Sequence, residues 1–178
     1  MADTPEQHLV TLRPATAGDA GMLVVLLQAA GADGMLGIDT ATLDPAREAE
    51  RLGALDLCQC CVLAASGDQG PVGFAMAVRG SGPALAHTAV VSVVVAPGCR
   101  RQGVGRLLLE GMTAWARAAQ VRKLCASVYA SNLGARALFT RAGYTTEGVR
   151  PRQLALRDTF DYEVWFGLWL SPDEGAAP

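Results

Sequence analysis

The sequence predicts one α/β domain across residues 1–178, with a mixed, mostly antiparallel sheet of six to seven strands and about four helices. Residues 90–95 form a valine-rich run that is too short for a helix and typical of a strand covered on both faces. From Val104 the apolar residues recur at helical spacing, which predicts an amphipathic helix directly after that strand. Residues 159–170 alternate between apolar and polar side chains, as a half-buried strand does.

The N-terminal part of the chain predicts a strand, a helix and a loop. The strand is expected at residues 8–14. Thr16 and Asp19 have the spacing of a capping box, which predicts a helix that ends near Ala30. Residues 31–42 are glycine-rich and are expected to form a loop.

A second helix is expected after Asp44, because Asp is a favourable N-cap and Pro45 fits the first helical position. A last helix is expected at residues 132–142, with Gly143 ending it. The core should span about residues 8–170 and leave a polar, flexible tail.

The remaining strands are expected at residues 59–65, 72–79, 85–95, 123–129, 145–154 and 159–170. The first two should form a hairpin, and the strand after the long helix should run parallel to the valine-rich one.

The turn between the valine-rich strand and its helix has the composition of a phosphate site. A helix begins there, so several main-chain N–H groups have no intrahelical acceptor, and the helix dipole adds partial positive charge. Arg100 and Arg101 add more charge, while Gly103 and Gly105 remove side chains that would keep an oxygen from the amides. An ordinary strand-to-helix turn with surface arginines is the alternative, and the glycine pair alone does not decide between the two.

The pattern Arg100-x-x-Gly103-x-Gly105 after a valine-rich strand resembles the acetyl-CoA loop of the GCN5-related N-acetyltransferase (GNAT) family. A second family segment, Asn-x-x-Ala-x-x-x-Tyr-x-x-x-Gly-Phe, resembles residues 132–144, which read Asn-Leu-Gly-Ala-Arg-Ala-Leu-Phe-Thr-Arg-Ala-Gly-Tyr. The resemblance extends from about Arg13 to Leu170. It implies the GNAT fold, with the sheet splayed between strands four and five and acetyl-CoA lying in the opening.

The resemblance also implies which residues bind acetyl-CoA. In the family the pyrophosphate lies on the turn, and the pantetheine arm runs along the preceding strand like an extra strand. The expected cofactor-binding residues are therefore Val93, Val94, Val95, Arg100, Arg101, Gln102, Gly103, Val104, Gly105, Arg106, Asn132, Ala135, Phe139 and Arg141. Asn132 could equally serve as a helix cap alone, and Arg141 could belong to a solvated face.

Two catalytic residues are expected from the same resemblance. Similar relatives have a His near the start of the fourth strand and an acidic residue three positions later; here His87 is present and Val90 occupies the acidic position. His87 is the first candidate base, and a structural histidine is the alternative. Glu163 matches an acidic position in the last strand, where it would bind the acceptor's ammonium or act through water; a salt bridge is the alternative. Phe139 replaces the Tyr that commonly protonates the thiolate, so that role is vacant or belongs to Tyr129 or Tyr144.

Composition limits the function classes. A net charge of −2 and a pI near 5.6 argue against a general nucleic-acid binder. The sequence shows no secretion signal and no apolar run of membrane-spanning length, so we expect a cytoplasmic protein. Cys58, Cys60 and Cys61 read as part of a buried strand, and no metal is expected.

The sequence thus predicts an acetyl-CoA-dependent N-acetyltransferase that acts on the primary amine of a small molecule, such as an amino acid. Because no Cys or Ser is paired with a base, the amine should attack the thioester directly in a ternary complex. A non-catalytic acyl-CoA-binding or sensing module is the rival class, motivated by Val90 and Phe139. A homodimer is possible, and no nucleic-acid or membrane partner is expected.

Overall fold

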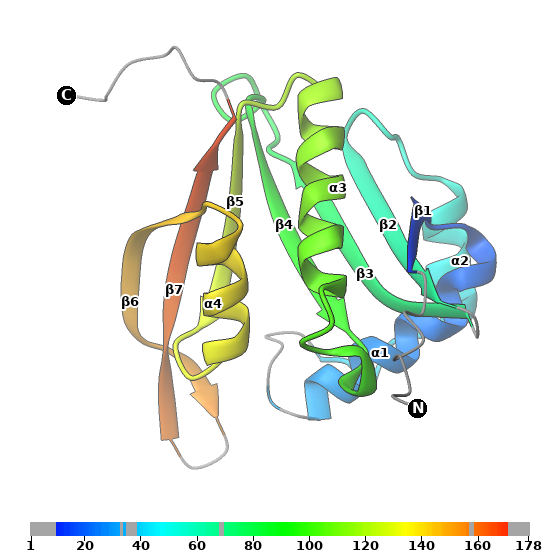
Figure 1. Ribbon diagram of the computed structural model, residues 1–178, viewed down its shortest axis with the longest axis horizontal. Coiled ribbons are helices and arrows are strands. Elements are labelled where there is room, and N and C mark those ends of the chain that lie inside the picture. The colour runs from blue at the N-terminus through cyan, green and yellow to red at the C-terminus, as the bar shows by residue number, and fades with distance from the viewer. Residues whose placement is uncertain (1–9, 33, 35–38, 68–69, 157–158, 171–178) are drawn as a thin grey trace, which may run out of the picture.

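The computed structural model describes residues 10–32, 34, 39–67, 70–156 and 159–170, and they form a seven-stranded sheet with helices on both faces (Figure 1). The strand order is β1-β2-β3-β4-β5-β7-β6, and every neighbouring pair is antiparallel except β4 and β5. The strands are β1 (Thr11–Pro14), β2 (Cys60–Gly67), β3 (Gly70–Arg79), β4 (Thr88–Val95), β5 (Lys123–Tyr129), β6 (Thr145–Leu156) and β7 (Thr159–Trp169). The predicted fold class is confirmed.

The helices begin and end close to the predicted residues. They are η1 (Ala17–Asp19), α1 (Ala20–Ala32), α2 (Pro45–Gly53), η2 (Pro97–Cys99), α3 (Val104–Ala118) and α4 (Leu133–Arg141). The side chain of Asp44 accepts a hydrogen bond from Ala46 N–H, and Asn132 caps α4 in the same way. Asp19 accepts hydrogen bonds from Thr16 and forms an ion pair with Arg13, which fixes the start of α1. None of the described helices is long and apolar enough to cross a membrane.

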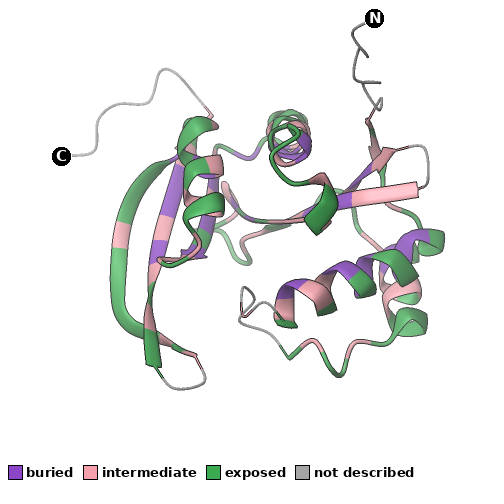
Figure 2. Ribbon diagram, turned by 60° about the horizontal axis from the view of Figure 1, so that its bottom comes forward, coloured by how far each residue is buried: buried purple, intermediate pink, exposed green. Residues whose placement is uncertain are grey.

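Two apolar clusters hold the helices to the sheet. One joins α3 and α4 to a single face, through side chains that include Leu108, Met112, Phe139, Leu124 and Phe166. The other joins α1 and α2 to the opposite face, which we call the α1 face, through side chains that include Leu23, Leu26, Leu52 and Phe74. Figure 2 shows this arrangement, with α3 above the sheet and α1 and α2 below it.

The sheet opens between its two central strands. The parallel ladder of β4 and β5 has three Cα pairs, from Thr88–Lys123 to Val90–Cys125. The rest of β4 pairs with β3 as far as Val95, and the rest of β5 pairs with β7 as far as Tyr129. The two strands therefore separate after Val90 and Cys125, at the position where the splay is predicted.

Two expectations about the fourth strand are wrong. The strand begins at Thr88 and not near Leu85, because Leu85 N–H bonds Gly82 and Thr88 N–H bonds Leu85 in a turn before it. The strand is also not covered on both faces along its whole length. Ala89 and Val91 are buried under α3, but Val90 on the α1 face is 46% exposed, because α1 covers that face only at the other end of the strand, near Phe74.

Candidate active site

The turn between β4 and α3 presents a row of unused hydrogen-bond donors. The main-chain N–H groups from Arg101 through Arg106 donate no hydrogen bond to any residue in the described part of the chain. Arg101 and Gly103 have left-handed backbone angles, with φ values of 65° and 87°, which turn successive N–H groups toward one side. Left-handed angles cost a non-glycine residue free energy, and such strain gathers at functional sites. The turn is therefore built to bind an anion with two or more oxygens, such as a pyrophosphate.

The two glycines of this turn have different structural roles. Gly103 is the N-cap of α3 and needs its positive φ, and a β-carbon there would meet no atom within 4 Å. Gly105 lies inside the first turn of α3, where a β-carbon would be 2.9 Å from Leu138 Cδ2 on α4. Gly105 thus allows α4 to pack against the start of α3, a role that the sequence did not predict.

The opening leaves one edge of β4 without a protein partner. Gly80 N–H bonds Thr88 O and Ala96 N–H bonds Val72 O, so the even-numbered residues of β4 point their main-chain groups toward β3. The odd-numbered residues Val93 and Val95, which lie beyond the ladder with β5, therefore direct their N–H and carbonyl groups toward the opening. The carbonyl of Val95 accepts a hydrogen bond from Arg100 Nε, which ties the edge to the anion-binding turn. An extended ligand chain can pair with this edge as an added strand would.

Residue His87 lies at the closed end of the opening. Its carbonyl accepts hydrogen bonds from Arg122 and Lys123 N–H, and its ring stacks on Trp169 with centroids 6.2 Å apart. Trp169 pairs with Lys123, which lies two residues before Cys125, the last residue of β5 that pairs with β4. The imidazole is therefore not at the opening itself, and it can reach a group there only through intervening water.

The carboxylate of Glu163 belongs to a cluster on the α1 face of β6 and β7. Its Oε2 accepts hydrogen bonds from Trp165 Nε1 at 2.9 Å and from Arg150 Nη1 at 3.3 Å, and Arg150 also lies over the Trp165 ring. Glu163 pairs with Tyr129 at the outer end of β5. Glu163 and Trp169 are six positions apart along β7, a span of about 20 Å. The structure therefore does not bring His87 and Glu163 together.

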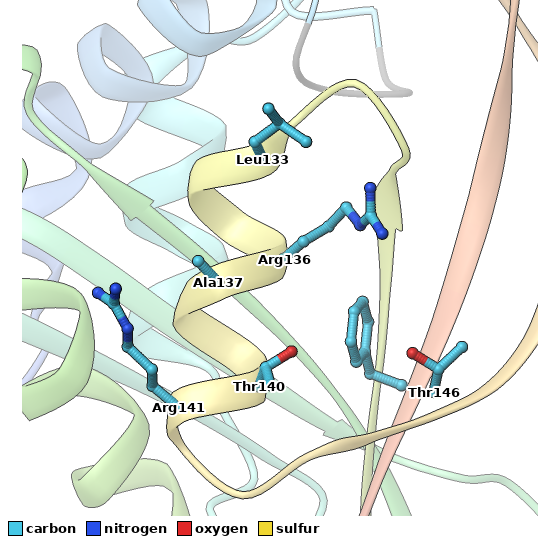
Figure 3. Close-up of a pocket in the computed structure, with 7 residues that line it drawn as sticks. Leu133, Arg136, Ala137, Thr140, Arg141 and Thr146 are labelled. Atoms are coloured by element: carbon cyan, nitrogen blue, oxygen red, sulfur yellow. The ribbon is translucent and has the colours of Figure 1, made fainter.

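The helix α4 carries four residues of the predicted cofactor site. Asn132 caps it, Ala135 is half-buried against the core, and Phe139 is 4% exposed between Tyr144 and Phe166. Arg141 extends to the α3 side of α4 (Figure 3). A groove of about 380 Å³ lies between α4 and the strands β6 and β7, and it is lined by Leu133, Arg136, Ala137, Thr140, Arg141, Thr146 and Phe166. Arg136 is anchored there by a hydrogen bond to Ala130 O.

The two tyrosines considered as proton donors differ in their surroundings. Tyr144 is 3% exposed, its hydroxyl has no partner among the described residues, and burial raises its pKa well above the ordinary value. Tyr129 lies on the α1 face at the outer end of the opening, where burial and the carboxylates of Asp161 and Glu163 raise its pKa. The raised pKa values keep both phenols protonated near neutral pH.

No group of three His, Cys, Asp or Glu residues in the described ranges could hold a metal ion.

Residues 36–144, more than half of the chain, match the sequence model of the acetyltransferase (GNAT) family. The chain belongs to the GNAT family. The match includes the anion-binding turn, the open edge of β4 and α4 as far as Tyr144. No curated protein sequence is similar enough to the chain to count as a match.

Solved GNAT structures have the same architecture. A protein named yncA from Salmonella typhimurium, solved with acetyl-CoA, is 23% identical, with 96% of this chain and 98% of that chain covered and a TM-score of 0.84. A ribosomal-protein-alanine N-acetyltransferase from Brucella melitensis is 25% identical, with 90% and 99% covered and a TM-score of 0.80. A phosphinothricin acetyltransferase from Sinorhizobium meliloti, solved with acetyl-CoA, is 19% identical, with 90% and 88% covered and a TM-score of 0.82. These likenesses support the GNAT fold.

Proposed function

We propose that this GNAT protein transfers the acetyl group of acetyl-CoA to the primary amine of a small molecule, such as an amino acid. The observation that carries the proposal is the row of unused N–H donors from Arg101 through Arg106, placed beside the open edge of β4. CoA combines a pyrophosphate with an extended arm that contains two amides. The turn suits the pyrophosphate and the strand edge suits the amides. Two similar structures, from Salmonella and Sinorhizobium, were solved with acetyl-CoA.

The remaining residues of the cofactor site add charge and shape. Arg100, Arg101, Arg106 and Arg141 supply positive charge around the turn, where it favours phosphate binding. Gln102 bonds Gly98 O and holds the turn, while Val104 is buried beneath it. Val93, Val94 and Val95 form the strand edge along which the arm would run. Asn132 and Ala135 are proposed to form the α4 wall of the opening, with Phe139 packed behind them in the core.

The chemistry requires a neutral amine and a stabilised oxyanion. The amine nitrogen bonds to the acetyl carbon, the carbon–sulfur bond breaks, and CoA leaves as a thiolate. The N–H group of Val93 points into the opening, where it can donate to the carbonyl oxygen as it gains negative charge. A thiol has a pKa of about 8.5, so the thiolate leaves without a side-chain acid, and Phe139 in place of Tyr is compatible with catalysis.

The ammonium must lose a proton before it attacks. We propose His87 as the final acceptor of that proton, reached through water, since its ring lies at the closed end of the opening. Glu163 is proposed to attract the ammonium to the α1 face, with Arg150 and Trp165 fixing its carboxylate. The similar protein from Brucella is named a ribosomal-protein-alanine N-acetyltransferase, which supports nitrogen as the acceptor atom.

Turnover with acetyl-CoA and a panel of amines tests this function. The panel contains L-amino acids, spermidine, an aminoglycoside and a peptide with a free N-terminal alanine, and a thiol-reactive dye detects released CoA. Calorimetry with CoA alone measures binding separately. We expect CoA binding together with thiol release on at least one amine. Binding without thiol release on any amine would favour an acyl-CoA sensor.

A further inference from the structure

Two serines lie at matching positions of the strands β4 and β5. Ser92 lies between valines in β4, and Ser127 lies between Ala126 and Val128 in β5. Because Val90 pairs with Cys125, Ser92 and Ser127 are each two residues beyond the last rung of the β4–β5 ladder, and both side chains lie on the α1 face. Both residues are exposed, and neither hydroxyl bonds another described residue. Two unpartnered hydroxyls therefore flank the opening where it begins.

The thioester would lie at the same level. The pantetheine arm has about twelve chain atoms between its phosphate and its sulfur, as many as about four residues of extended backbone, or about 13 Å. Counted back from Val95, which is tied to the anion-binding turn by Arg100, that length reaches Val91 and Ser92. The other face of the opening is covered by α3 and α4, so an acceptor must approach from the α1 face, between the two serines.

The two side chains proposed above for proton transfer and ammonium attraction are already engaged or lie farther from the start of the opening. Oε2 of Glu163 is bonded by Arg150 and Trp165, and His87 stacks on Trp169 beyond the Val90–Cys125 rung. We infer that the hydroxyls of Ser92 and Ser127 bind the acceptor nitrogen, one from each flank, and orient its lone pair toward the thioester carbon. This inference rests on the proposed acetyl transfer and assigns two residues to the acceptor site.

The hydroxyls act as hydrogen-bond acceptors and do not take the proton. An N–H of the amine donates to each serine oxygen, which fixes the nitrogen between the strands. The third N–H of the ammonium faces solvent on the α1 face, and its proton leaves to water before the attack, which frees the lone pair that faces the carbon. As the carbon–nitrogen bond forms and the carbon–sulfur bond breaks, one of the two remaining N–H groups gives its proton to water on the α1 face, which balances the thiolate that leaves.

Alanine and threonine variants at both positions test the assignment, using the panel amine that wild type acetylates fastest. Ser92→Ala and Ser127→Ala each remove one acceptor, so we expect kcat/KM for the amine to fall up to about 10-fold in each and about 100-fold in the double variant. Ser92→Thr and Ser127→Thr keep the hydroxyl on an exposed strand position that tolerates branching, so they should retain most activity. CoA affinity by calorimetry should stay at the wild-type value throughout.

The matched control is Ser66→Ala, which removes a hydroxyl from β2 that has no partner among the described residues and lies two strands away from the opening. It should leave kcat/KM unchanged. A double alanine variant with wild-type kcat/KM would overturn the inference, and so would threonine variants as slow as alanine. If wild type itself acetylates no amine, the proposed function fails, an outcome distinct from an active enzyme that is indifferent to both serines.

Discussion

Leu138 of α4 packs directly against Gly105 in the first turn of α3, so that a β-carbon on Gly105 would lie 2.9 Å from Leu138 Cδ2. This contact joins the helix that begins at the anion-binding turn to the helix that walls the other side of the opening. The width of the opening is therefore coupled to the size of residue 105. The sequence predicts Gly105 to be part of a phosphate-binding loop, and the structure shows that it also allows α3 and α4 to pack closely.

Replacing Gly105 by valine should disturb this helix contact. Overpacking a closed contact costs about 1–3 kcal/mol, so we expect Gly105→Val to lower the free energy of unfolding by that amount. Leu138→Ala in the same chain should restore part of the loss, because it removes the atoms that the new side chain meets. Thermal or urea unfolding of the two single variants and the double variant measures the coupling. Strictly additive effects would show that the two residues do not touch.

Gly103→Ala should act on binding more than on packing. Its φ of 87° is a left-handed angle that costs an alanine about 1–2 kcal/mol, and relief of that strain would turn the neighbouring N–H groups away from the anion. We expect acetyl-CoA affinity, measured by calorimetry, to fall about 10-fold. Gly98→Ala is the matched control, since Gly98 has no positive φ and a β-carbon at that position would meet no atom within 4 Å. Equal affinities in the two variants would argue against the strained turn.

Signals carried by neighbouring residues are sufficient to predict most elements and the anion-binding turn. Asp44 with Pro45, and Asn132 before α4, mark helix starts that the structure confirms. The splay follows from the family resemblance. The separation of His87 from Glu163 depends on how β5 pairs with β7, and the Gly105–Leu138 contact depends on how two helices pack. Neither follows from spacing along the chain. A valine-rich run predicts a strand buried on both faces, whichever helix covers each face, so it predicts the wrong exposure for Val90.

The proposed role of His87 makes a prediction about pH. If the imidazole is the final proton acceptor, His87→Ala should lower kcat and remove the acidic limb of the pH–rate profile, because the group that must be deprotonated there is gone. Calorimetry should show unchanged CoA affinity, since His87 lies at the opposite end of β4 from the anion-binding turn. A variant with the wild-type pH–rate profile would assign His87 to its stacking contact with Trp169 alone.

The ion pair of Arg13 and Asp19 should make stability depend on pH. The hydrogen bond from Arg13 lowers the pKa of the buried Asp19 carboxyl from 3.8 to about 2. A depressed folded-state pKa gives stability that is present above the unfolded pKa and lost as pH falls toward 2. Wild type should therefore exceed Asp19→Asn by about 2 kcal/mol at pH 7, and the difference should shrink between about pH 4 and pH 2. Urea unfolding at several pH values measures it, and a constant difference would contradict the assignment.

We propose that acetyl-CoA lies on the Arg101–Arg106 turn and along the open edge of β4. A crystal structure of the protein with acetyl-CoA would show whether it does. We expect pyrophosphate oxygens within hydrogen-bond distance of the N–H groups of Arg101 through Arg106, and the arm paired with Val93 or Val95. Pyrophosphate bound elsewhere, for example in the groove between α4 and β6, or an arm outside the β4–β5 opening, would contradict it.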